Sequence, residues 1–168
     1  LASPPAFGAV QAGGLFGGPL ADAVHALKYG DRPGLARPLG AWLSERIGLP
    51  AGAAIVSIPL GRRRRIARGY DQAALLADEL ASSQGRSGDR LRGVLLRIRE
   101  TPPQVGRGRA ERRRNVKGAL WSNGAVEGRE VVIVDDVVTT GATADAAARA
   151  LLDAGATRVS VAALARAE

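Results

Sequence analysis

The residues best suited to chemistry lie in one short stretch, residues 131–143. Four apolar, mostly β-branched residues, Val131–Val134, are typical of a strand buried on both faces. Asp135 and Asp136 follow directly, and a turn of small and hydroxyl residues then leads into an alanine-rich segment with helical spacing. Backbone N–H groups and a helix N-terminus in this order surround one anion, and carboxylates beside it accept hydrogen bonds from hydroxyls. The pattern therefore favours a phosphorylated sugar as ligand.

Other phosphate-binding motifs fit this stretch less well. A P-loop needs Gly-Lys-Ser/Thr, and no lysine lies here; a dinucleotide-binding fingerprint needs three spaced glycines, and Gly141 stands alone. A purely structural interpretation is that Asp135 and Asp136 only cap the following helix. Because burying two adjacent charges is a costly way to cap a helix, we favour the binding interpretation.

The stretch resembles the phosphoribosyl diphosphate (PRPP) signature of type I phosphoribosyltransferases, which is an apolar strand, two acids, two apolar residues and Thr-Thr-Gly-Gly/Ala-Thr. The resemblance implies that Asp135 and Asp136 hold the ribose 2′- and 3′-hydroxyls as the catalytic acid pair. It also implies a 5′-phosphate loop, formed by Thr139, Thr140, Gly141, Ala142 and Thr143.

A second phosphate loop is indicated after the first predicted strand. Small residues there let backbone amides approach a phosphate, and arginine guanidinium groups match its oxygens. In the type I family this loop binds the pyrophosphate of PRPP, which assigns that role to Leu60, Gly61, Arg62 and Arg63. The simpler alternative is a solubilising, arginine-rich surface loop.

Further motifs resemble one subgroup, the ComF-type phosphoribosyltransferases linked to bacterial competence. The matching segments, spread over about residues 20–165, are Leu27-Lys28-Tyr29, Pro59 to Arg63, Arg68 to Gln72, Arg99 to Gln104 and Arg112 to Val116. The resemblance implies lid and accessory roles for Lys28, Arg68, Gln72, Gln104, Arg114 and Lys117. The 104–116 segment is also similar to glutamine amidophosphoribosyltransferases, where the equivalent segment folds over bound PRPP. The alternative for Lys28 is an ordinary helix-end cation.

Two departures from these families matter. ComF-type proteins usually begin with a cysteine zinc-binding module, whereas this chain has no cysteine. Purine-salvage enzymes place an acid at the position of Thr139, where it can act as a base on the incoming purine. A threonine cannot take that role, which argues against purine salvage.

The elements that must position these residues alternate along the chain. Helical spacing predicts helices over residues 20–28, 35–47 and 73–81 and after the signature, and strands are expected at 53–60, 91–98, 131–134 and 159–164. We expect a loose arm at 1–18, a single phosphoribosyltransferase-like domain at 19–168, a basic loop at 61–69 and a mobile loop at 100–118. This order predicts an α/β fold of three layers, with a mainly parallel sheet of the type I phosphoribosyltransferase kind and N-terminal helices. Since ligands bind at the carboxyl ends of parallel strands, loops 61–69, 99–118 and 135–143 should converge on one cleft.

Composition narrows the partners. The 168-residue chain has a net charge of +8, supplied almost wholly by arginine, which favours a polyanionic partner. With no cysteine and a single histidine, His25, thiolate- or histidine-based metal sites are excluded, and we assign no metal-ligating residue. No stretch reaches the ~20 apolar residues of a membrane span, and we expect a soluble, cytoplasmic protein with no membrane partner.

These patterns predict a PRPP-binding protein that transfers the phosphoribosyl group to an unidentified nucleophile and releases pyrophosphate. Mg²⁺ would be carried largely by PRPP. The alternative is a non-enzymatic protein on the same fold that senses PRPP or handles single-stranded DNA, although aromatic residues that could stack on bases are few. A third interpretation is a structural partner in a larger complex. The sequence does not specify the acceptor or the oligomeric state.

Overall fold

A four-stranded parallel sheet forms the centre of the protein. The computed structural model describes residues 4–99 and 118–167. The strands lie in the order β1-β6-β5-β2, and every neighbouring pair is parallel. Their bounds are Val10–Leu15 for β1, Ala54–Ser57 for β2, Glu130–Val138 for β5 and Arg158–Arg166 for β6.

Helices and a small second sheet complete the described part of the chain. The α-helices are α1 (Gly18–Tyr29), α2 (Ala36–Ser44), α3 (Arg62–Arg68), α4 (Gln72–Ser83) and α6 (Ala142–Asp153). Two 3₁₀ turns are η1 (Pro33–Leu35) and η2 (Ser87–Asp89), and β3 (Leu95–Arg97) pairs antiparallel with β4 (Leu120–Ser122). No helix in these ranges is both long and apolar enough to cross a bilayer.

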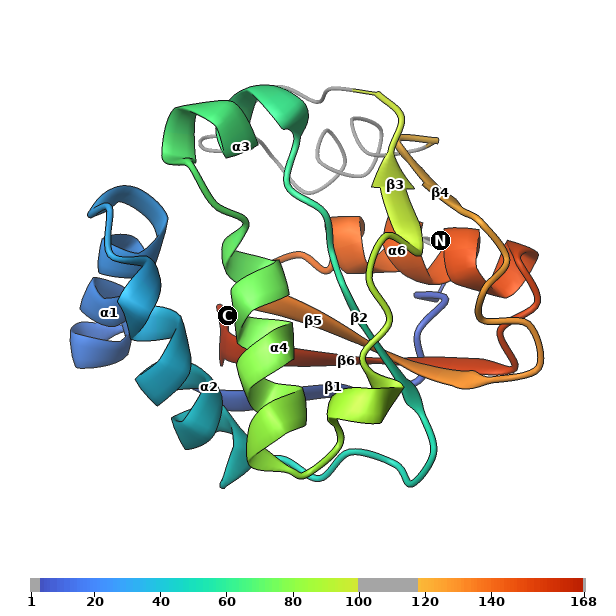
Figure 1. Cartoon of the computed structure of the whole chain (residues 1–168), viewed down its shortest axis with the longest axis horizontal. Helices are drawn as coiled ribbons and strands as arrows, with labels where there is room; N and C mark the ends of the chain where they lie inside the picture. The colour runs from blue at the N-terminus through green and yellow to red at the C-terminus, as the bar shows by residue number, and fades with distance from the viewer. Residues whose placement is uncertain (1–3, 100–117, 168) are drawn as a thin grey trace.

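Side chains of β5 alternate between two cores. Val131 and Ile133 pack in a core with α6, β3 and β4, whereas Val132 and Val134 pack in a second core with α1, α2 and α4. Figure 1 shows α4 on one side of the strands and α6 on the other. A strand buried on both faces needs apolar residues at every position, which explains the unbroken β-branched run. The predicted three-layer α/β fold is confirmed.

The segment predicted as a loose arm contains the edge strand β1, so that prediction is wrong for residues 10–15. β1 pairs with β6 along its length. Because Gly13 and Gly14 have no side chains, this segment lacks the alternating apolar pattern by which a strand is recognised. Gly13 is required by packing, because a Cβ there would lie 2.2 Å from Cζ3 of Trp42 on α2.

Three further predictions need correction. The expected basic loop at 61–69 is mostly the helix α3, which stands away from the sheet in Figure 1 and ends at Gly69 in the left-handed conformation (φ 81°). The expected core strand at 91–98 is reduced to β3, which lies in the small second sheet with an unpredicted partner, β4. The predicted signature strand is longer than expected, so that Asp135 and Asp136 lie within β5.

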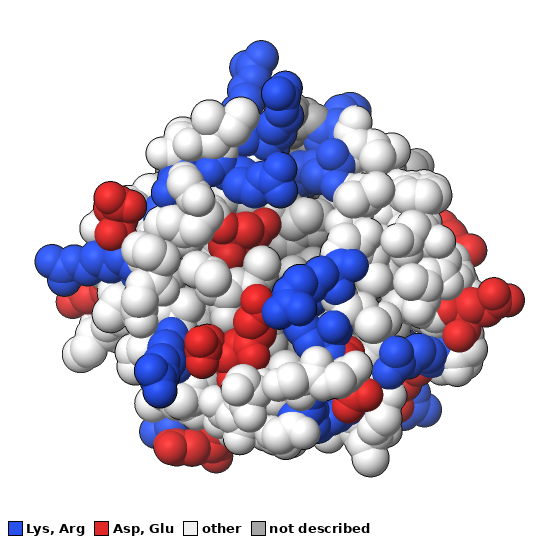
Figure 2. Space-filling model, viewed as in Figure 1, with Lys and Arg blue, Asp and Glu red and all other residues white. Residues whose placement is uncertain are grey.

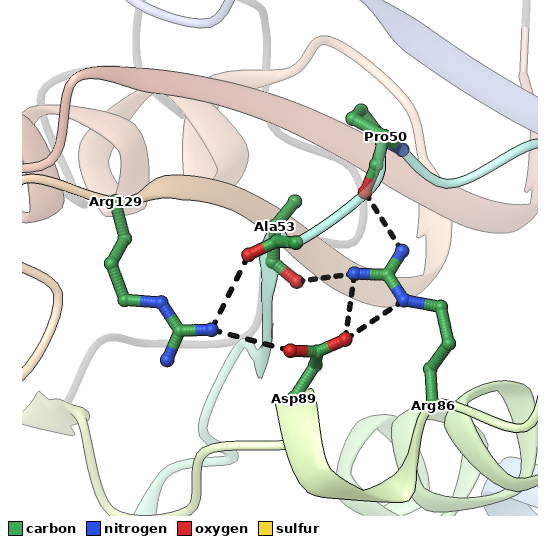
Figure 3. A network of polar contacts seen from close by, with 6 residues as sticks. Pro50, Ala53, Arg86, Asp89 and Arg129 are labelled. Carbon is green, nitrogen blue, oxygen red and sulfur yellow. Dashed lines mark hydrogen bonds and ion pairs between the residues drawn. The ribbon is translucent and has the colours of Figure 1, made fainter.

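An arginine–aspartate network fixes the opposite end of the sheet from the signature loop. Asp89 accepts from Arg86 at 2.9 Å and from Arg129, which precedes β5, at 3.4 Å. The same two arginines donate to backbone carbonyls of the loop before β2, at Pro50, Gly52 and Ala53 (Figure 3). The network thus joins the starts of β2 and β5, the two strands whose other ends carry the predicted ligand loops.

The packing of β1 gives the first test. Gly13→Ala should lower the free energy of unfolding by about 1–3 kcal/mol, because the added methyl group overlaps the Trp42 ring and overpacking has costs of this size. The matched control is Gly34→Ala, where the new methyl group meets no atom within 4 Å. Urea denaturation of both variants measures the difference. Equal stability in the two variants would mean that β1 is not packed under Trp42.

Candidate functional site

The carboxyl ends of β2 and β5 border a cleft of about 1100 Å³. Its walls come from the end of α1, residues 58–60, α3, the start of α4 and the end of β5. On the face of the molecule drawn in Figure 2, lysine and arginine side chains gather at the top, where α3 lies in Figure 1, and acidic side chains lie below them. The loops predicted after β2 and β5 therefore meet, whereas the third loop falls mainly on residues 100–117, outside the described ranges.

The acidic pair lies at the floor of this cleft, and its two members have different surroundings. Asp136 is 4% exposed; its Oδ1 lies 3.1 Å from Lys28 Nζ, and its Oδ2 accepts from Gln72 Nε2 at 2.8 Å. Asp135 is less buried, and its Oδ1 accepts from the backbone N–H of Asp136 at 2.8 Å. Two helices, α1 and α4, thus contribute polar side chains to one carboxylate of β5.

Burial, followed by the charge of Asp136, raises the pKa of Asp135 to about 8. Lys28 acts in the opposite direction but does not cancel the two effects. Near neutral pH the free protein therefore holds a proton on this carboxyl group. A cationic or hydroxyl-bearing ligand that favours the charged form would release that proton on binding.

A small depression of about 30 Å³ lies beside the cleft, formed by the loop between β5 and α6. Gly141 adopts φ 74°, which a residue with a side chain rarely does, so the turn needs glycine. The N-terminal segment supports the loop: the N–H of Ala6 donates to Asp145 Oδ1 at 2.7 Å, and the Phe7 ring would lie 3.2 Å from a Cβ at Gly141. Asp135 lines both the depression and the cleft. The geometry joins a small cradle, whose lining includes three threonines, to a larger cavity with basic residues in its wall.

The loop after β2 is held from two sides. Asp71, the N-cap of α4, accepts from the Leu60 N–H at 2.8 Å and from Ala74 N–H at 3.2 Å. Arg97 of β3 donates from Nε to the carbonyl of Pro59 at 3.1 Å. Because these contacts fix the backbone at 59–60, the start of α3 is fixed against the acidic pair across the cleft.

Comparison with known proteins decides the family. A family model described as "Phosphoribosyl transferase domain" matches residues 97–168. The chain is 39% identical to "DNA utilization protein YhgH" of Salmonella typhi over 85% of this chain and 65% of that protein. It is 36% identical to "Competence protein F" of Haemophilus influenzae over 68% of this chain and 50% of that protein. It is 34% identical to "Competence protein ComFC" of Bacillus subtilis over 60% of this chain and 39% of that protein.

The chain is homologous to these proteins, and its residues 97–168 match a phosphoribosyl transferase domain. The predicted family is therefore confirmed, and the parallel α/β fold agrees with it. The chain spans 65% of the length of the first of these relatives.

The structure brings most of the predicted ComF-type site residues together. Lys28, Leu60, Arg68, Gln72 and the acidic pair line the cleft, and the predicted 5′-phosphate loop lines the cleft or the depression. Gly61 is buried at the start of α3. Arg62 and Arg63 are exposed on α3 and do not line the cleft. Arg64 of the same helix does line it. Gln104, Arg114 and Lys117 lie outside the described residues.

Sequence reasoning missed several residues of the site. Phe16, Tyr29, Asp31 and Arg97 line the cleft without having been assigned a role there. Tyr29 carried a signal, because it belongs to the quoted Leu27-Lys28-Tyr29 motif, and its ring lies under the Arg68 guanidinium at 5.4 Å. No sequence motif indicated Arg97, because its place in the site depends on β3 folding back beside the loop after β2.

The raised pKa of Asp135 predicts a pH effect on the ligand-free ComF-type domain. An unfolded Asp titrates near ~3.9, so between that pH and about 8 the folded state binds more protons than the unfolded state. The free energy of unfolding should therefore fall as the pH rises through this window. Asp135→Asn should flatten the fall, because the amide carries no charge to bury.

Urea denaturation across this pH window measures the slope. Asp153→Asn, which changes an exposed carboxylate at the end of α6, serves as control and should keep the parent slope. Parallel profiles for the parent and Asp135→Asn would contradict the burial of a protonated acid at this position.

Proposed function

We propose that this protein binds PRPP and transfers its phosphoribosyl group to a nucleophile with release of pyrophosphate. The observation that carries the proposal is the place of Asp135, which lines both the small depression at the β5–α6 loop and the large cleft. A ligand that occupies both must join a phosphate to a hydroxyl-bearing group and to a further anionic group. PRPP has these three parts in that order.

In this proposal each part of PRPP meets a chemically matched surface. The 5′-phosphate accepts hydrogen bonds from the backbone of residues 139–143 and from the threonine hydroxyls. The ribose hydroxyls donate to a carboxylate of the acidic pair. The diphosphate extends toward the cations that line the cleft, Lys28, Arg64, Arg68 and Arg97. Guanidinium groups pair with phosphate oxygens in a bidentate way, which suits a leaving group that gains charge.

The reaction follows from this arrangement. The nucleophile attacks C1 of the ribose, the bond from C1 to the pyrophosphate oxygen breaks, and its electron pair leaves with pyrophosphate. The cations of the cleft stabilise the charge that develops on the leaving group, and the cradle keeps the ribose in a fixed orientation. These effects depend on position and charge, so the scheme requires no covalent intermediate with the protein.

Mg²⁺ fits the same site as part of the ligand. Mg²⁺ prefers oxygen ligands, and the diphosphate and ribose of PRPP supply them. Within residues 4–99 and 118–167, no three acids or histidines gather closely enough to hold a metal ion alone. In the proposal Mg²⁺ therefore takes most of its ligands from PRPP and neutralises part of the diphosphate charge.

A second candidate is the handling of single-stranded DNA on the same fold, without catalysis. The names of the relatives, a DNA utilization protein and competence proteins, favour it. The net charge of +8 is compatible with it. Charge alone does not separate a polynucleotide from a small polyphosphate, so the two candidates need a direct comparison.

Thermal denaturation with and without ligand tests the proposal. Mg²⁺-PRPP at a hundredfold excess over Kd should stabilise the parent by about 2.7 kcal/mol, and the double variant Asp135→Asn/Asp136→Asn should lose most of that shift. Asp22→Asn, an exposed acid on α1, is the control and should keep it. If the double variant fails to fold, Asp135→Asn alone is used.

Inorganic phosphate, AMP and a single-stranded oligonucleotide are measured beside PRPP. Equal PRPP shifts in the parent and the acid variants would refute ribose binding by the pair. An oligonucleotide that binds tightly at ~0.2 M salt, where charge-driven binding is much weakened, together with no shift from PRPP, would favour the second candidate.

A further inference from the structure

The two carboxylates of the acidic pair differ in how many of their hydrogen-bonding positions are occupied. Asp136 Oδ1 contacts Lys28 Nζ at 3.1 Å and accepts from the Val137 N–H at 2.7 Å, while Oδ2 accepts from Gln72 at 2.8 Å. A carboxylate has about four such positions, so Asp136 has little capacity left. Asp135 Oδ1 accepts one backbone N–H, and its Oδ2 accepts no hydrogen bond from any residue in the described ranges.

The partners of Asp136 extend into three helices of the cleft wall. Lys28 ends α1, and Gln72 begins α4. The Gln72 side-chain oxygen accepts from Arg68 of α3, whose guanidinium lies over the Tyr29 ring. A single carboxylate on β5 is thus connected, directly or through Gln72, to three helices that border the cleft.

We propose that the acidic pair divides its work: Asp135 receives the ribose hydroxyls, and Asp136 is a positioning residue that holds Lys28 and Gln72 in the cleft wall. This inference rests on the proposed function, and it assigns unequal roles where the family resemblance implies equal ones. The physical reason is capacity. A ribose hydroxyl needs a free lone pair facing the cleft, and Asp135 offers one, whereas Asp136 is 4% exposed and nearly saturated.

The same contacts explain why Lys28 can serve the ligand. Its side chain is 22% exposed, and an ammonium group this far from solvent needs an anion nearby. Asp136 supplies that anion and takes only part of the three-donor capacity of Lys28. The remaining donors of Lys28 stay available at the cleft for a phosphate oxygen.

The ligand-free protein tests the positioning role. Asp136→Asn and Lys28→Met should each lower stability, because each leaves a poorly hydrated charge without its partner. The double variant Asp136→Asn/Lys28→Met should lose less than the sum of the two, which a double-mutant cycle in urea measures. Asp145→Asn/Lys28→Met is the control cycle; Asp145 pairs with Arg149 on α6, so its losses should add. Additive losses in the first cycle would overturn the positioning role.

Ribose 5-phosphate tests the ribose role, since it carries the hydroxyls and the 5′-phosphate but no diphosphate. Asp135→Asn should lose about tenfold or more in affinity by calorimetry, the loss expected when a charged acceptor is removed. Asp136→Asn should stay within about threefold of the parent, the smaller effect expected of a residue that the sugar does not touch. Equal losses in the two variants would overturn the division of work.

The pH profile of this affinity separates a chemical role from a structural one. The charged groups facing Asp135 are Asp136 beside it on β5, Lys28 of α1 and Asp71 before α4. The parent should bind ribose 5-phosphate more tightly as the pH rises toward 8 and Asp135 ionises. Asp135→Asn should lose this rise. Asp136→Asn should still show the rise in affinity. The rise should occur at lower pH, because the pKa of Asp135 falls when the negative charge of Asp136 is removed. Ionisation of the ligand is common to all three proteins and cancels in the comparison.

The outcomes also separate this inference from the proposed function. If PRPP and ribose 5-phosphate bind to none of the proteins, the proposed function fails, and the ribose role of Asp135 fails with it. If PRPP binds and the acid variants behave alike, the proposed function stands and the division of work is wrong. A rise with pH that persists in Asp135→Asn would overturn the assignment of Asp135.

Discussion

Two adjacent carboxylates at the end of a buried strand are the constraint on which this structure depends. Removing one partner of a buried ion pair costs about 3–5 kcal/mol, so Asp136 needs Lys28 and Gln72 where they lie. These two residues come from α1 and α4, which also pack their apolar faces against β5 and β6. The apolar core and the polar contacts therefore require the same arrangement of helices.

The parallel sheet brings the remaining parts of the site to the same end. β2 and β5 are neighbours, so the loops that follow them meet across the cleft. The network of Arg86, Asp89 and Arg129 joins the other ends of these strands (Figure 3). Asp71 and Arg97 then fix the loop after β2. These contacts hold the loops after β2 and β5 in one arrangement, which is what a ligand that spans the cradle and the cleft requires.

The sequence predicted the parts of the fold whose signals are local. The β-branched run before the acids and the helical spacing of residues 73–81 reflect burial on both faces of a strand and on one face of a helix, and both elements formed. β1 was missed because its glycines have no apolar pattern; their reason is Trp42, which is distant in the sequence. α3 was missed because a run of arginines resembles a solvated loop.

The site was predicted to the level of segments but not always of side chains. The arginine-rich segment does border the cleft, but helical geometry turns Arg62 and Arg63 away and Arg64 and Arg68 inward. Which arginines face the cleft depends on the rotation of α3 about its axis. Gly61 and Gly69 at its ends and the hydrogen bond from the Leu60 N–H to Asp71 set this rotation, and no local sequence pattern encodes it. The unequal burial of Asp135 and Asp136 is likewise invisible in the sequence, because it follows from the side on which α1 and α4 pack.

A crystal structure of the protein with PRPP and Mg²⁺ is the most direct test of the central claim. We expect the 5′-phosphate within hydrogen-bonding distance of the backbone of residues 139–143, the ribose hydroxyls on Asp135, and the diphosphate beside Lys28 and Arg68. Asp136 should keep its contacts with Lys28 and Gln72. PRPP bound with its ribose away from Asp135, or bound outside this cleft, would contradict the account.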